Sequence, residues 1–279
     1  MSTRLWDPRE RFAELARLPD ARIELARAAL WIAAEEYPAL DVEGQLARLD
    51  ALAALAEPQL REAASEAERA LRLLRFLHDE QGFVGNQERY GDPRNSFLNE
   101  VLERRRGIPI SLALILLEVA RRLGLPLAGV SFPGHFLVKL EGPVLRVLDP
   151  FHGRVLDLAQ CRARLEAALG PQAVFVPERQ LRATGPREIL VRMLTNLKHL
   201  YLHARDLGRS LGCCERILLL VPDAPQELRD RGLVFEQLEC FAAAAADLER
   251  FLELAPDDES ASAVRERLRQ LRARPQRLH

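Results

Sequence analysis

The stretch from Pro109 to Leu123 constrains the fold of this chain most, because it is apolar on nearly every side. Pro109 suits the first position of a helix, where its missing amide hydrogen would have no helical acceptor. Leu112, Leu114 and Ile115 then face different directions around the helix axis, so no side of the helix is suited to water. The run is also shorter than the roughly 20 apolar residues of a membrane span. The sequence therefore predicts a buried helix in a globular domain.

Short, turn-rich pieces lie on both sides of this helix, where glycine and proline recur. A preceding amphipathic helix is predicted, with Asn95 or Ser96 as its N-cap and Gly107 just past its end. After the buried helix, apolar runs at 136–140 and 144–148 flank a Glu-Gly-Pro turn, a pattern typical of an antiparallel hairpin. One buried helix followed by a small sheet indicates an α+β domain.

Helical patterns dominate both ends of the chain. Apolar residues recur at the three-four spacing of a helical face at 23–34, 42–55 and 66–77. Near the other end, Pro222 and Pro256 each close an apolar helix, and their spacing of 34 residues equals the repeat length of the tetratricopeptide unit. We therefore predict a mostly helical α+β fold in three parts. These are a helical N-terminal segment at 1–80, the α+β core at 81–180 and a repeat region at 186–271.

The composition argues against several classes of function. With 40 basic and 41 acidic residues the formal net charge is −1, so no overall field steers the chain onto nucleic acid or a membrane surface. The first residues lack the continuous apolar segment of a secretory signal, so we expect a cytoplasmic protein. Four cysteines, none in a CxxC pair, indicate neither a disulfide framework nor a zinc site, and we expect no metal or cofactor.

Three candidate catalytic residues stand on separate elements of the core: Ser111, His135 and Asp149. Ser111 lies in the first turn of the buried helix, where the helix dipole favours negative charge. His135 and Asp149 are each about six or seven residues from the hairpin turn, so antiparallel pairing brings them to the same end of the sheet. A carboxylate on one imidazole nitrogen fixes the tautomer and leaves the other nitrogen free as a base, which is the orienting half of a catalytic triad.

Structural interpretations of the polar residues stand beside the catalytic one. Ser111 can bond the free amides of the first helical turn, and Asp149 can end its strand by accepting backbone amides. We interpret His152 as structural. The same holds for His199 and His203, whose spacing of four can bind a metal ion, because no third ligand at zinc-type spacing accompanies them.

Three segments carry a resemblance to a known family: NSFLNEVLERRRGIPISLA at 95–113, GVSFPGHF at 129–136 and LDPF at 148–151. With these segments the chain resembles the bacterial SirB group, transglutaminase-like proteins with C-terminal tetratricopeptide repeats. The resemblance implies a papain-like transglutaminase core. Active members of that fold use a Cys at the start of the buried helix, a His on the next strand and an Asp on the strand after. His135 and Asp149 match this His and this Asp.

The nucleophile does not match. The resemblance places the Cys two residues after a glycine, and counting from Gly107 that position holds Pro109. Ser111 lies two residues further on, so its side chain is turned by roughly 200° around the helix axis, at about 100° per residue. The sequence therefore disfavours an active transglutaminase.

Two functional hypotheses follow. The first is a pseudoenzyme adaptor, in which the degenerate core and the repeats bind a protein or peptide partner. Repeats of this type line a groove with their first helices, which predicts five groove residues: Asn196, His199, Leu200, Arg231 and Phe235. The alternative is a hydrolase or acyltransferase acting on amide or thioester bonds, with Ser111 as nucleophile, His135 as general base and Asp149 as orienting group.

Overall fold

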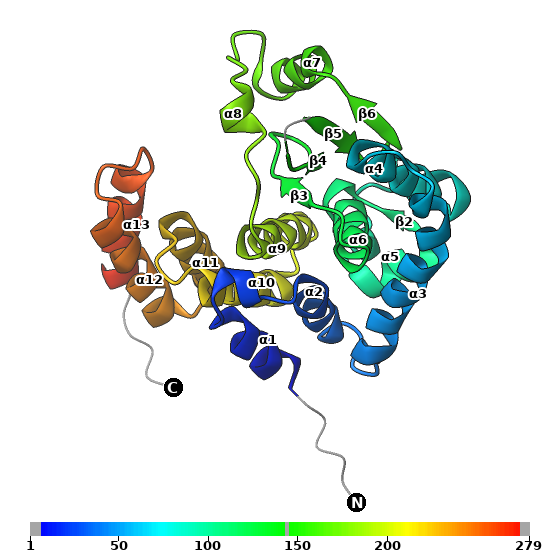
Figure 1. Ribbon diagram of the computed structural model, residues 1–279. Coiled ribbons are helices and arrows are strands. Elements are labelled where there is room, and N and C mark those ends of the chain that lie inside the picture. Colours follow the sequence, from blue (N-terminus) through cyan, green and yellow to red (C-terminus); the bar gives the residue numbers. More distant parts are fainter. Residues whose placement is uncertain (1–6, 143–144, 274–279) are drawn as a thin grey trace, which may run out of the picture. The chain divides into compact units, whose positions relative to one another are not determined.

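The computed structural model describes residues 7–142 and 145–273 (Figure 1). They divide between Met193 and Leu194 into two compact units. The predicted fold class, α+β and mostly helical, is confirmed. The helices and short turns of the first unit are α1 (Pro8–Ala16), η1 (Asp20–Arg22), α2 (Leu25–Ala34), α3 (Val42–Arg61), α4 (Glu66–Arg75), η2 (Phe76–Glu80), η3 (Pro93–Asn95), α5 (Leu98–Arg104), α6 (Pro109–Arg122), α7 (Leu158–Leu169) and α8 (Pro177–Gln180). Its strands are β1 (Val84–Gly85), β2 (Arg106–Gly107), β3 (Leu127–Val130), β4 (Leu137–Leu140), β5 (Arg146–Asp149) and β6 (Arg154–Leu156). Helix α9 (Pro186–His203) crosses the division, and the second unit continues with α10 (Leu207–Leu220), α11 (Pro225–Gln237), α12 (Phe241–Leu254) and α13 (Ala261–Ala273).

Helix α6 is the buried helix that the sequence predicts. Nearly all of its side chains are buried between Pro109 and Ala120. It contacts helices α2, α3, α4 and α5 and strands β1 to β4. Each fully buried Leu or Ile side chain contributes about 1.5–3 kcal/mol relative to an exposed one, so α6 supplies a large share of the core's stability.

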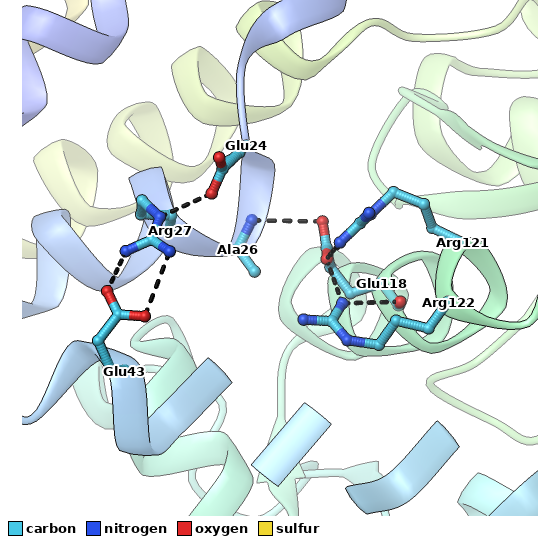
Figure 2. A network of polar contacts seen from close by, with 7 residues as sticks. All are labelled: Glu24, Ala26, Arg27, Glu43, Glu118, Arg121 and Arg122. Carbon is cyan, nitrogen blue, oxygen red and sulfur yellow. Dashed lines mark hydrogen bonds and ion pairs between the residues drawn. The ribbon is translucent and has the colours of Figure 1, made fainter. Parts of the chain in front are cut away.

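Glu118 is a buried carboxylate within this apolar helix (Figure 2). It accepts the amide hydrogen of Ala26 at 3.3 Å and pairs with Arg122 at 2.6 Å and Arg121 at 3.1 Å. Ala26 lies in the first turn of α2, and the N-cap of that helix, Glu24, makes no side-chain capping bond. Helix α6 therefore supplies the negatively charged acceptor that the start of α2 lacks.

The sheet is antiparallel, with the strands in the order β3-β4-β5-β6. Val138 of β4 lies opposite Leu148 of β5, which confirms the predicted hairpin. Residue 143 of its predicted turn and residue 144, the first of its predicted second strand, lie outside the described residues. Strands β3 and β6, which we did not predict, extend the sheet at its two edges. The sheet and α7 share an apolar cluster of buried residues that includes Leu137, Val147 and Leu165.

The region before α6 differs from the prediction. Asn95 and Ser96 do not cap α5, because Asn95 ends the preceding turn η3 and the N-cap position falls one residue after Ser96. Helix α5 ends at a left-handed residue, Arg105 (φ 57°), and Gly107 belongs instead to β2, which pairs in parallel with β1. A Cβ atom on Gly107 would lie 2.6 Å from Ser111 Oγ. Glycine is therefore required by this close approach rather than by a helix end.

The second unit confirms the predicted repeat. Helices α10 and α12 each end two residues before the repeated prolines, Pro222 and Pro256. Ala244 is fully buried, and a Cβ atom on Gly232 would lie 3.0 Å from the side chain of Leu248 and 3.3 Å from the Ala244 carbonyl oxygen. Small residues thus allow α11 and α12 to pack closely, as the repeat requires. Each helix in the described part of the chain is too short or too polar to span a membrane.

We expect Glu118→Ala to lower the free energy of unfolding by about 2–4 kcal/mol, because it leaves the amide of Ala26 without its buried acceptor and Arg122 with only the exposed carboxylate of Asp50. Urea unfolding followed by circular dichroism measures the change. The matched control is Arg121→Ala, since the Arg121 side chain is 66% exposed and exposed pairs contribute at most about 1 kcal/mol. A Glu118→Ala protein as stable as the control would contradict this role of Glu118.

Candidate functional site

Asp149 is the centre of a polar cluster at the end of β5. Its fully buried carboxylate lies 2.9 Å from His135 Nε2 through Oδ1, and 2.7 Å from His152 Nδ1 through Oδ2. Arg164 of α7 donates to Oδ2 at 2.9 Å, and Arg154 of β6 lies 3.8 Å from the same oxygen. The structure thus brings His135 and Asp149 together, as the hairpin geometry predicts, and adds three further side chains to the pair.

Two tight turns position these side chains. His135 follows a left-handed glycine, Gly134 (φ 67°), and enters β4, while Asp149 is the last residue of β5. The turn after Asp149 contains Gly153, which is also left-handed (φ 64°). A Cβ atom on Gly153 would collide with the ring of His78, which lies in the π-helical turn η2. Close packing against η2 therefore holds the turn that carries His152.

The electrostatics of the cluster keep Asp149 ionised. Burial by itself raises the pKa of Asp149, but the hydrogen bonds and charges of His135 and His152 outweigh burial and lower this pKa to about 2. Because the carboxylate bonds Nε2 of His135, the neutral imidazole has its hydrogen on Nε2 and its lone pair on Nδ1. The pair therefore has the chemistry of an oriented base.

Ser111 is engaged elsewhere. Its fully buried hydroxyl donates to the carbonyl oxygen of Asn95 at 2.6 Å and accepts the amide hydrogen of Ile108 at 3.1 Å. Within the described residues no hydrogen bond joins Ser111 to His135, and the buried Pro109 occupies the first position of α6. The structure therefore does not assemble the predicted set of Ser111, His135 and Asp149, because the hydroxyl joins the start of α6 to the preceding turn.

The candidate groove residues of the repeats face two directions. Arg231 makes a bidentate ion pair with Asp247 of α12, with both distances 2.7 Å, and its guanidinium lies 5.7 Å from the ring centre of Phe235. These two residues of α11 are therefore turned toward α12. On α9, His199 is exposed and Leu200 is half-buried, so these two remain accessible. The remaining predicted groove residue, Asn196, is also half-buried on α9.

Sequence analysis missed a buried charge cluster in the repeats. Lys198 of α9 is almost fully buried, and its ammonium donates to Glu227 Oε2 and Asp230 Oδ2 of α11, each at 2.8 Å. Burial lowers the pKa of Lys198, but the two carboxylates outweigh burial and raise it. The sequence did contain one sign of this cluster, because Lys198 stands at the position of the 34-residue repeat that Gly232 occupies in the next repeat. The ion pairs fix α9 against α11.

The lowered pKa of Asp149 makes stability depend on pH. A carboxyl group whose pKa falls from 3.8 to about 2 on folding stabilises the protein above about pH 4, and this contribution disappears as the pH falls toward 2. We expect the difference in unfolding free energy between the natural protein and Asp149→Asn to shrink by roughly 2–3 kcal/mol over this range. Urea unfolding at a series of pH values measures it. A difference that is constant with pH would contradict the electrostatic role of the cluster.

Comparisons with known proteins agree with both units. A model of the transglutaminase-like superfamily matches residues 44–195, and a tetratricopeptide repeat model matches residues 197–269. A UPF0162 protein of Xylella fastidiosa is 42% identical over 90% of this chain and 91% of its own length. The UPF0162 protein PA3419 of Pseudomonas aeruginosa is 38% identical over 95% of this chain and 96% of its own length. Protein SirB1 of Salmonella typhimurium is 32% identical over 84% of this chain and 88% of its own length. No match was found among solved structures.

Proposed function

The chain belongs to the transglutaminase-like superfamily, in the family of the UPF0162 and SirB1 proteins, and from this premise we propose that it is a protein- or peptide-binding adaptor. The observation that carries the proposal is the state of Ser111, whose hydroxyl is buried and bonded to Asn95 and Ile108. Acyl transfer requires a nucleophile within hydrogen-bond reach of its base, about 2.6–3.2 Å away. Within the described residues of the core, the oriented imidazole of His135 is retained, and Ser111 makes no hydrogen bond to it.

The repeats support a binding role because their first helices share one face of the array. On α9 this face offers an exposed imidazole, His199, beside two half-buried side chains, Asn196 and Leu200. We call these three residues the α9 surface. Arg231 and Phe235 are left out of it, because they are engaged with α12. A mixture of apolar, amide and imidazole groups suits a peptide, whose backbone needs hydrogen bonds and whose side chains need apolar contact.

The buried charge cluster supports a rigid surface. Lys198 lies between Asn196 and His199 in the sequence, and its two ion pairs join α9 to α11. Breaking a buried pair costs about 3–5 kcal/mol, so the backbone that presents the α9 surface is held in one arrangement. A surface ordered before binding loses less conformational entropy when a partner docks.

Photo-crosslinking in the full-length chain tests the adaptor proposal. We expect a photo-reactive amino acid at His199 to capture a partner in a bacterial extract, and the same amino acid at Leu219 to capture none. Leu219 is the matched control because it is 42% exposed but lies on α10, the second helix of the repeat. Mass spectrometry identifies the captured protein.

Affinity measurements with the purified partner complete the test. Replacing Leu200 by Ser removes apolar contact area from the α9 surface, and we expect this change to weaken binding by about tenfold, or about 1.4 kcal/mol. The change Leu219→Ser should leave affinity unchanged, and circular dichroism verifies that both variants are folded. Equal crosslinking at the two positions, or unchanged affinity in Leu200→Ser, would remove the α9 surface from the account.

A further inference from the structure

We propose that His135, Asp149 and His152 form a binding site for a divalent transition-metal ion of the zinc class. Each residue offers one ligand atom, and these atoms all lie within 4.8 Å of one another. Imidazole nitrogen and carboxylate oxygen are ligands that Zn²⁺ and its first-row neighbours take in proteins. The inference does not depend on the adaptor proposal, since its residues lie in the core and not in the repeats.

The geometry is close to that of a three-ligand site. Both imidazoles already direct a ring nitrogen at the Asp149 carboxylate, at 2.9 Å for His135 and 2.7 Å for His152. The two rings are 5.8 Å apart between centres and nearly parallel, with an interplanar angle of 23°. In a tetrahedral site with bonds of about 2.0–2.2 Å, neighbouring ligand atoms are roughly 3.3 Å apart. Because the ligand atoms lie at most 4.8 Å from one another, a change of at most about 1.5 Å in their separation suffices to admit an ion.

Metal binding requires both imidazoles in their neutral form, so any proton that holds a histidine in the charged form is released when the ion binds. A neutral imidazole binds a metal ion through whichever nitrogen has no hydrogen. His135 would therefore carry its hydrogen on Nδ1 instead of Nε2, and His152 on Nε2 instead of Nδ1. Two hydrogen bonds to Asp149 are thus exchanged for two nitrogen–metal bonds.

Arg164 and Arg154 limit which ion the site accepts. Arg164 donates a hydrogen bond to Asp149 Oδ2 at 2.9 Å, while Oδ1 faces His135. Outer hydrogen bonds of this kind orient carboxylates that ligate a metal ion. Both guanidinium charges repel a dication. The strong nitrogen bonds of Zn²⁺, Ni²⁺ or Co²⁺ can outweigh that repulsion, whereas Mg²⁺ and Ca²⁺ prefer sites made of oxygen ligands.

The exposure of the ligands favours an open site. The His152 side chain is 31% exposed, whereas that of His135 is 7% exposed and that of Asp149 is fully buried. An ion would therefore enter from the His152 side and keep a fourth position for water or another ligand. Three protein ligands with one open position are typical of catalytic zinc sites, while structural sites have four.

Titration of the metal-free, full-length chain with Co²⁺ tests the site, because Co²⁺ bound to nitrogen and oxygen ligands absorbs visible light. We expect one Co²⁺ per chain, displaced by Zn²⁺. The change His152→Ala should weaken binding at least about tenfold. The conservative change His152→Cys should retain binding and add a sulfur-to-cobalt absorption band, which a purely structural role of His152 would not produce.

The matched control uses the other histidine pair. His199 and His203 are exposed on α9, and His203 Nδ1 donates to the His199 carbonyl oxygen at 2.7 Å. The double change His199→Ala and His203→Ala should leave Co²⁺ binding unchanged. The proposal is overturned if no stoichiometric binding occurs, if His152→Ala binds as tightly as the natural chain, or if the double change abolishes binding.

Discussion

Enclosure of α6 is the constraint on which the first unit depends. A helix with almost no polar side must be covered all round, and helices α2 to α5 together with strands β3 and β4 provide that cover. The few polar groups on α6 are tolerated because each has a partner. The Glu118 carboxylate accepts the amide hydrogen of Ala26 at the start of α2. The Ser111 hydroxyl donates to the carbonyl oxygen of Asn95 in η3, the turn before α5. The same burial that stabilises the fold therefore keeps the Ser111 hydroxyl away from solvent.

This constraint explains how the core can retain half of a catalytic arrangement. The register of β4 and β5 places His135 beside Asp149 whatever stands at the start of α6. Because His152 and Arg164 also bond the carboxylate, the cluster is held together although Ser111 makes no hydrogen bond to it. An ordered group of two imidazoles and a carboxylate has a use in metal binding that is independent of acyl transfer. The repeats add a second surface whose chemistry suits a peptide.

Periodicity and strand register were the parts of the structure that sequence could predict. The burial of α6, the β4–β5 hairpin and the 34-residue repeat each follow from local patterns. Long-range packing decided the rest. Arg164 reaches Asp149 because α7 packs on the sheet. Arg231 points toward α12 because it forms an ion pair with Asp247 of that helix. The predicted cap of α5 was wrong because Asn95 ends η3 and its side-chain amide is bonded to Asn86 and to the carbonyl oxygen of Arg89.

Intact-mass spectrometry with a fluorophosphonate probe tests the central claim, that Ser111 is a structural residue, most directly. A serine activated by a neighbouring imidazole reacts with such a probe to form a stable phosphonyl ester. For the folded, full-length chain we predict no adduct at Ser111. One adduct per chain on Ser111, absent from Ser111→Ala, would contradict the account.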